Sequence, residues 1–249
     1  MSLLEIAMLV GVGFIAGFIN VIAGGGSLLT LPVLIFLGIP SPVANATNRL
    51  GIFFQNVFSV RGFRSKGISV VPYSYWVAIS ACLGSVLGSL FAVKIVDDVF
   101  NKVLAVVMIG VMLITVFKPG MKATTEEGVF SKKRNALSIV LFFFLGIYGG
   151  FIQAGIGFFL IAALSLVHHL PMTKVNSIKV FVALCYTVVA LVIFIANDMV
   201  RWEYGLTLAA GTALGGWTAS RWSVGIPDKY IRGFLMVTVT ALAIKLWFF

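Results

Sequence analysis

An apolar run near the start of the chain is interrupted by three consecutive glycines, Gly24, Gly25 and Gly26. A short apolar segment then begins at Ser27, and Asn20 lies just before the break. A helix that starts at such a break directs free backbone N–H groups and the positive end of its dipole into the gap. Because this arrangement favours negative charge, we predict an anion-binding site here, with the side chain of Asn20 facing it.

A second break of the same kind follows Gln153, where Gly155 and Gly157 precede another short apolar segment. The residues before it, Gly-Phe-Ile-Gln at 150–153, resemble Gly-Phe-Ile-Asn at 17–20. Paired interruptions at matching places are the best sequence indication of a substrate site at the membrane midplane. The alternative is that glycines only let helices pack closely. We prefer that alternative for two further pairs of glycines, Gly84 with Gly88 and Gly211 with Gly215.

Amide and basic side chains follow each break. They are Asn45, Asn48 and Arg49 in the first half, and Asn176 and Lys179 in the second. A charged side chain in the first turns of an apolar helix is costly and usually faces a cavity or a partner. We therefore predict that Arg49 or Lys179 supplies positive charge to the anion site. Two alternatives stay open: the amides cap helix N-termini, and the charged side chains extend to the membrane surface.

Few other residues suggest chemistry. Gln55 and Asn56 are expected to face inward, although Asn56 could equally bond a neighbouring helix. His168 and His169 precede Pro171 and are interpreted as a surface loop without a role. The sequence has no phosphate-binding loop, zinc motif or plausible catalytic triad. We therefore expect a protein that is not an enzyme and needs no cofactor or metal.

The composition indicates that these residues lie in a membrane. Of 249 residues, 60% are hydrophobic and 10% are charged, whereas a soluble domain carries roughly 25% charged residues. Apolar runs such as 3–23 and 70–93 are long enough to cross a bilayer, because about 20 apolar residues suffice. The continuous runs lack the alternation of a membrane barrel. The predicted fold class is an all-α polytopic membrane protein.

Two tandem homologous halves are expected, because the order of matching residues is the same in both. We predict a first transmembrane repeat over 1–118, a cytoplasmic linker over 119–135 and a second repeat over 136–249. Eight to ten membrane segments follow, since two are too short to cross unaided. The ten apolar segments are 3–23, 27–39, 43–60, 70–93, 99–117, 137–154, 157–168, 175–196, 203–220 and 230–249.

The loop charges indicate how the halves are oriented. The net charge of +10 comes from basic residues in short loops, as in cytoplasmic loops of membrane proteins, so nucleic-acid binding is not expected. In the first half the basic loop follows the third segment, whereas in the second it follows the fourth and contains Arg221, Lys229 and Arg232. An odd number of crossings per half would invert the second copy and explain this shift. Parallel halves with eight crossings remain an alternative.

The stretch GFINVIAGGGSLLTLPVLIFLGIPSPVANATN at 17–48 resembles the TauE/SafE family of sulfite and organosulfonate exporters, and GFIQAGIGFFLIAALSLVHHLPMTKVNSIK at 150–179 is its weaker counterpart. The resemblance covers nearly the whole chain. It implies a multi-pass protein of the bacterial inner membrane whose partners are the lipid bilayer and a small anion such as sulfite or a sulfonate. A homo-oligomer is a further expectation.

These observations lead us to expect a secondary transporter that binds its anion between the two glycine breaks and exposes it alternately to each side. The residues predicted to form the site are Asn20, Gly24, Gly25, Gly26, Ser27, Asn45, Asn48, Arg49, Gln153, Gly155, Gly157, Asn176 and Lys179. A carboxylate substrate would use the same hydrogen-bond donors and is the first alternative. A passive anion channel is the second alternative.

Overall fold

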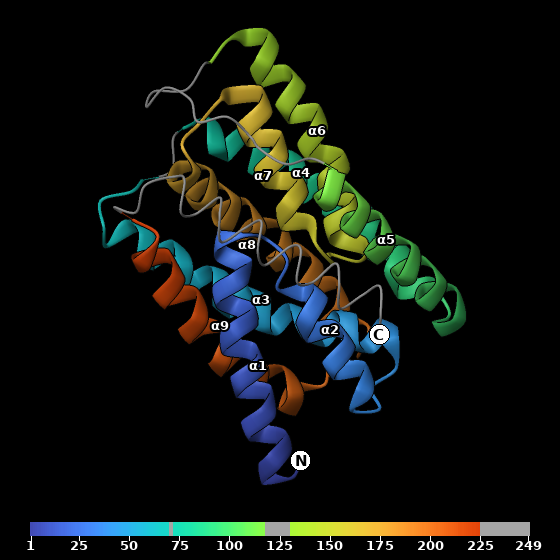
Figure 1. Ribbon diagram of the computed structural model, residues 1–249. Helices are drawn as coiled ribbons and strands as arrows, with labels where there is room; N and C mark the ends of the chain where they lie inside the picture. Colours follow the sequence, from blue (N-terminus) through green and yellow to red (C-terminus); the bar gives the residue numbers. More distant parts are fainter. Residues whose placement is uncertain (70–71, 118–129, 225–249) are drawn as a thin grey trace.

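The computed structural model describes residues 1–69, 72–117 and 130–224, and within these residues it contains α-helices and no β-strand (Figure 1). The predicted all-helical fold is confirmed. The expected tenth segment, 230–249, lies outside the described residues, as do Lys229 and Arg232. In chain order the helices are α1 (Leu3–Ile22), α2 (Ser27–Phe36), α3 (Ser41–Arg64), α4 (Tyr73–Lys94), α5 (Asp97–Phe117), α6 (Lys132–Phe151), α7 (Ile156–His168), α8 (Met172–Ala196) and α9 (Trp202–Trp222).

Several helices extend beyond the apolar segments that predicted them. Helix α6 begins at Lys132 and not at residue 137, because the Ser131 hydroxyl accepts a hydrogen bond of 3.3 Å from the backbone N–H of Arg134 and caps the helix. Helix α3 likewise continues to Arg64, past the apolar segment that ends at residue 60. Hydropathy marks only the apolar part of a helix, whereas backbone hydrogen bonds and caps determine where it begins and ends.

Four of the described helices, α1, α4, α6 and α8, are long and apolar enough to cross a membrane. Helix α3 is as long, but amide and guanidinium side chains occupy its first half and middle, and all of them are buried. A polar helix of this kind is stable in a bilayer only when neighbouring helices or a cavity meet its polar side chains. Helix α3 is therefore an interior helix, and most of its buried polar residues have protein partners or line a cavity.

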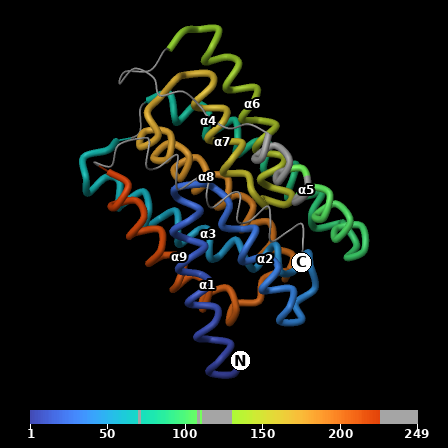
Figure 2. Tube along the Cα trace, viewed as in Figure 1, coloured from blue at the N-terminus to red at the C-terminus, as the bar shows by residue number. Residues whose placement is uncertain are grey.

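Each short helix turns back along the long helix before it (Figures 1 and 2). Gly26 at the start of α2 lies against Ala16 near the end of α1, and Leu34 near the end of α2 shares a core cluster with Leu9 of α1. The second half repeats this arrangement with α6 and α7. Two contacts show it: Tyr148 to Phe159, with ring centroids 5.6 Å apart, and Ser138 Oγ to His168 Nε2 at 2.8 Å.

Glycines bring α4 and α6 into close parallel contact. A Cβ atom on Gly84 would lie 2.0 Å from the carbonyl oxygen of Phe143, and one on Gly88 would lie 2.0 Å from that of Ile147. Atoms cannot approach so closely, so only glycine fits at either position. Residue numbers rise together along both helices, which therefore run in the same direction.

Helices α1 and α9 make the same kind of contact. A Cβ atom on Gly211 would lie 2.1 Å from the carbonyl oxygen of Val10, and one on Gly215 would lie 2.1 Å from that of Phe14. This pair is also parallel. The prediction that the two pairs of glycines serve helix packing is confirmed.

The long helices form two groups that run in opposite directions. Helix α3 is parallel to α9, because Gly51 contacts Thr212 and Gly62 contacts Ser220. The start of α3 meets the end of α6, and the start of α8 meets the end of α1, through hydrogen bonds described below. Helices α1, α3 and α9 therefore run one way, and α4, α6 and α8 run the other way (Figure 1).

The described basic loops lie at one end of the helices. The Arg221 guanidinium donates a 3.0 Å hydrogen bond to the Ser65 hydroxyl, which joins the end of α9 to the end of α3. Tyr73 at the start of α4 packs on Phe130 just before α6, with ring centroids 5.5 Å apart. These contacts gather a set of cations at that end: Arg61, Arg64, Lys66, Lys132, Lys133, Arg134 and Arg221.

His168 is fully buried at the end of α7, so its interpretation as a surface residue is wrong. Its ring centroid lies 4.5 Å from that of Tyr73 and 4.9 Å from that of Phe130. The sequence pattern was misleading because α7 extends to His168 and α8 follows directly after Pro171, which leaves too little chain for an exposed loop.

Candidate substrate-binding site

The two glycine breaks touch each other. A Cβ atom on Gly24 would lie 2.3 Å from the carbonyl carbon of Gly157, and a Cβ atom on Gly157 would lie 2.2 Å from the Gly24 Cα. Backbone meets backbone here, so neither position tolerates a side chain. Gly24 has a φ of +92° and Gly155 a φ of +68°, and both angles lie in the left-handed region that favours glycine. The structure thus brings together two breaks that are far apart in sequence.

A row of three amide side chains runs from the first break to α3. The backbone N–H of Gly26 donates to Asn20 Oδ1 at 3.2 Å, and Asn20 Nδ2 donates to Gln55 Oε1 at 3.0 Å. Gln55 Nε2 then donates to Asn56 Oδ1 at 3.3 Å. Asn56 Nδ2 has no hydrogen-bond partner, although only 1% of Asn56 is exposed. The amide row therefore ends in a buried N–H donor without a partner.

Gln153 occupies the second break in a left-handed conformation, with a φ of +60°. Its Nε2 lies 3.1 Å from the Thr187 hydroxyl and 3.4 Å from the Tyr186 hydroxyl, both on α8. Its Oε1 is buried without a partner. Each break thus places an amide side chain against the third helix of its own half, where Asn20 contacts Gln55 and Gln153 contacts two hydroxyls.

Lys179 lies in the second turn of α8, where only 3% of its surface is exposed. Its ammonium group donates to the carbonyl oxygens of Asn20 at 2.9 Å and Val21 at 2.6 Å, and to Asn176 Oδ1 at 2.9 Å. The two carbonyls belong to the last turn of α1, the negative end of that helix dipole. All three N–H groups of Lys179 are therefore engaged, while its positive charge stays beside the break.

Arg49 holds the end of α6 in a similar way. Its guanidinium donates to the carbonyl oxygens of Gly149 at 2.6 Å and Gly150 at 2.7 Å, and it lies 4.9 Å from the centroid of the Phe194 ring. Arg49 is fully buried. The alternative in which Arg49 and Lys179 extend to the membrane surface is therefore wrong.

The neighbouring asparagines complete a reciprocal pattern. Asn45 Nδ2 donates to the carbonyl oxygen of Phe151 at 2.9 Å, and Asn176 Nδ2 lies 3.4 Å from that of Ile22. The third helix of each half thus binds the carbonyl end of the first helix of the other half. The residues preceding α3 and α8 are prolines, so the interpretation of these asparagines as N-terminal caps is wrong.

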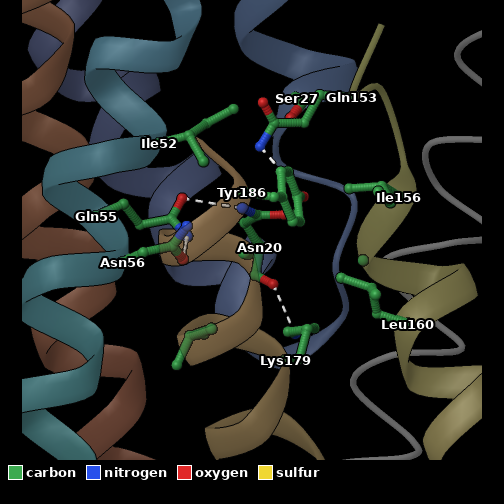
Figure 3. A pocket seen from close by; sticks show the side chains of 13 residues that line it. Asn20, Ser27, Ile52, Gln55, Asn56, Gln153, Ile156, Leu160, Lys179 and Tyr186 are labelled. Carbon is green, nitrogen blue, oxygen red and sulfur yellow. Dashed lines mark hydrogen bonds between the residues drawn. The ribbon is translucent and has the colours of Figure 1, made fainter. Parts of the chain in front are cut away.

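Several of these residues line a small cavity halfway along α3 and α8 (Figure 3). Its volume of about 20 Å³ is enough for about one water molecule. Figure 3 shows Gln55 and Asn56 side by side on α3, with Ile156 and Leu160 of α7 on the opposite side. The described lining contains one charged side chain, that of Lys179, and no carboxylate. The lining residues are Asn20, Ser27, Ile52, Gln55, Asn56, Gln153, Ile156, Gly157, Leu160, Lys179, Val180, Ala183 and Tyr186.

Five of the residues predicted for the site line this cavity. Three more contact them directly: Gly24 packs on Gly157, Gly26 bonds Asn20, and Asn176 bonds Lys179. Eight of the predicted residues therefore line the cavity or contact a residue that does. The five lining residues are Asn20, Ser27, Gln153, Gly157 and Lys179.

The remaining predicted residues do not line the cavity. Gly25 and Gly155 belong to the backbone of the two breaks. Asn45 and Arg49 point to the end of α6, and the buried Asn48 Oδ1 has no partner in the described structure. The positive charge beside the cavity is that of Lys179 and not that of Arg49.

Sequence reasoning expected Gln55 and Asn56 to face inward but did not assign them, or Tyr186, to the site, although all three line the cavity. The two amides gave a usable signal, because polar side chains in the middle of a membrane helix usually face a cavity or a neighbour. Tyr186 gave none, since aromatic residues are common in apolar helices. Among the described residues, no group of three His, Cys, Asp or Glu side chains could hold a metal ion.

A polar cavity beside two helix breaks, within a bundle of membrane-length helices, is an arrangement typical of transmembrane transporters. The model of the family described as "Sulfite exporter TauE/SafE" matches residues 9–246. The chain belongs to this family.

Curated relatives agree with this class of protein. The chain is 28% identical to "Probable membrane transporter protein ORF9" of Sinorhizobium sp., over 97% of this chain and 92% of that protein. It is 29% identical to a "Probable membrane transporter protein" of Haemophilus influenzae, over 84% and 82% of the two chains. With YfcA of Escherichia coli K12, which has the same description, it shares 26% identity over 98% and 90%. No solved structure matches the chain.

Proposed function

We propose that this chain is a secondary transporter that carries sulfite or an organosulfonate across the inner membrane by alternating access. The observation that carries the proposal is the chemistry of the cavity between the breaks. Its described lining combines the charge of Lys179 with amide and hydroxyl groups and contains no carboxylate. In a setting of low dielectric, such a lining favours an anion over a cation.

The size of the cavity supports a transport cycle with distinct states. A space for about one water molecule is too small for sulfite or a sulfonate. The breaks must therefore separate before the anion can enter. Because Gly24 and Gly157 are in direct contact, a small movement of one hairpin relative to the other would widen the cavity. The structure then corresponds to a closed state of the cycle.

The arrangement of the helices supports two inverted halves, with a first repeat over 1–118, a linker over 119–135 and a second repeat over 136–249. Helix α6 runs opposite to its counterpart α1, as α8 does to α3 and α9 does to α4. The pairs α1–α9 and α4–α6 exchange places under this correspondence, and so do Lys179 and Arg49.

The path of the chain in the first half also supports inversion. The α1–α2 hairpin returns to the side from which it entered, and α3, α4 and α5 would then cross the bilayer. Three crossings are an odd number, so the second half begins on the opposite side. This path favours inverted halves over the alternative of parallel ones.

The test is a counterflow measurement with the purified chain in liposomes. Vesicles loaded with unlabelled sulfite should accumulate external labelled sulfite transiently and saturably, and methanesulfonate should compete. Empty liposomes are the control. Flux that is inhibited by succinate but not by methanesulfonate would assign a carboxylate substrate. Sulfite flux without counterflow or saturation would instead identify a passive channel.

A further inference from the structure

We infer that the side-chain amide of Asn56 is the principal hydrogen-bond donor to the transported anion, oriented by the amide row that starts at the backbone of Gly26. The inference rests on the proposed function, because it assigns a specificity-determining residue to the same cavity. The two residues then have different roles. Lys179 supplies positive charge, and Asn56 supplies the N–H group that contacts the anion.

The direction of the amide row is determined by its first bond. A backbone N–H can only donate, so the atom of Asn20 that meets Gly26 must be its oxygen. Asn20 Nδ2 therefore faces Gln55, whose oxygen accepts and whose nitrogen is left to face Asn56. Reversing any one amide would place two donors or two acceptors against each other. The end of the row at Asn56 is consequently an N–H group and not an oxygen.

The position of that N–H group points to a ligand. Asn56 is 1% exposed, lines the cavity and has no partner for Nδ2 in the described structure. Buried polar groups in folded proteins are nearly always hydrogen-bonded, and an unpaired one is costly. A donor kept without a protein partner at the wall of a cavity is suited to an acceptor oxygen that enters the cavity.

The second half does not duplicate this donor. Asn56 follows Asn45 by the same number of residues as Thr187 follows Asn176, so Thr187 occupies the matching position. Gln153 Nε2 contacts the hydroxyls of Thr187 and Tyr186, and a hydroxyl can donate or accept. On the α8 side of the cavity, the hydroxyl of Tyr186 can therefore donate to a ligand or accept from it. On the α3 side, the amide nitrogen of Asn56 can only donate.

Lys179 cannot replace that donor in this state of the protein. Its three N–H groups already bond two carbonyl oxygens of α1 and Asn176 Oδ1. An anion in the cavity would feel the ammonium charge without displacing these bonds. Among the described lining residues, the amide of Asn56 is the buried donor whose N–H group has no protein partner, so it is free to bond an acceptor oxygen directly.

Two variants of Asn56 test the inference in the full-length chain. Asn56→Asp still accepts from Gln55, but it replaces the unpaired N–H group by a carboxylate oxygen and adds a negative charge. Asn56→Leu has nearly the same shape but neither donor nor charge, so it separates loss of the donor from repulsion. Asn101→Asp, on the exposed face of α5, is the matched control.

The measurements are the concentration of sulfite that gives half-maximal counterflow and the thermal shift caused by sulfite and by methanesulfonate. We expect Asn56→Leu to weaken the apparent sulfite affinity by about tenfold or more, and Asn56→Asp to weaken it further. Asn101→Asp should behave like the native chain. The melting temperature of each variant without ligand shows whether it is folded.

The outcomes separate this inference from the proposed function. If the native chain binds sulfite and folded Asn56→Leu binds it equally well, the inference is wrong and the proposed function stands. If Asn56→Leu keeps native affinity and only Asn56→Asp loses it, repulsion explains the loss and the inference is also wrong. If the native chain neither binds nor moves sulfite, methanesulfonate or succinate, both proposals fall.

Discussion

Lys179 and Arg49 show how a membrane protein accommodates buried cations without carboxylates. Each donates to two carbonyl oxygens in the last turn of a helix from the other half. These carbonyls lack partners within their own helix and carry the negative end of its dipole, so they stabilise a positive charge. Both side chains therefore hold the carbonyl end of a helix, but of the two only Lys179 lines the cavity.

This difference predicts different effects for Lys179→Met and Arg49→Met. Both variants should lower the melting temperature, because each carbonyl left unpaired costs about 1–3 kcal/mol. Only Lys179→Met should also weaken sulfite binding by about tenfold or more, since it removes the charge beside the cavity. The measurements are thermal unfolding in detergent and sulfite-induced stabilisation. An equal loss of affinity in the two variants would contradict the assignment of the charge to Lys179.

The contact between the breaks makes the two hairpins depend on each other. Gly157→Ala would place a methyl group about 2.2 Å from the Gly24 Cα, so the hairpins would have to separate. We expect this variant to lose sulfite counterflow and to unfold at a lower temperature than the native chain. Gly11→Ala is its control, because nothing lies within 4 Å of the added methyl group on α1. Native counterflow in Gly157→Ala would show that the closed contact is not required for transport.

The parallel helix pairs depend on glycine for a different reason, which is close packing along their length. In Gly215→Ala the new methyl group would lie about 2.1 Å from the carbonyl oxygen of Phe14, so α1 and α9 would have to move apart. We expect a loss of stability of about 1–3 kcal/mol, the usual cost of overpacking. Thermal unfolding compared with Gly11→Ala measures this effect, and similar melting temperatures for the two variants would argue against the tight interface.

At the scale of the whole molecule, the cations at the end of α3, the start of α6 and the end of α9 gather at one end, beside the start of α4. Positively charged loops face the cytoplasm in membrane proteins. We expect this end to be cytoplasmic and the end that contains Asn197 to face the other side.

Labelling with a membrane-impermeant maleimide tests this orientation. The background chain has its two free cysteines, Cys82 and Cys185, replaced by alanine. In intact cells with a permeable outer membrane, Asn197→Cys should react, whereas Lys66→Cys should react only after the inner membrane is permeabilised. Both positions are exposed. The opposite pattern would reverse the proposed orientation.

The sequence by itself determined the local features of this protein. Apolar runs predicted the helices, glycine pairs predicted close packing, and the two breaks predicted where backbone would be interrupted. Each of these depends on residues that are near one another in the chain, through helix propensity, periodicity and the conformational freedom of glycine. The ends of α3 and α6 were less predictable, because polar residues extend a helix without changing its apolar pattern.

Only the tertiary structure decided which of the polar residues meet. Arg49 was as good a candidate as Lys179 in sequence, but its partners are 100 and 101 residues away, at the end of α6. The role of Asn56 depends on a chain of bonds that begins at Gly26 on another helix. Hydrogen bonds between distant segments follow from how helices are rotated and packed, and neither hydropathy nor spacing along the chain encodes that geometry.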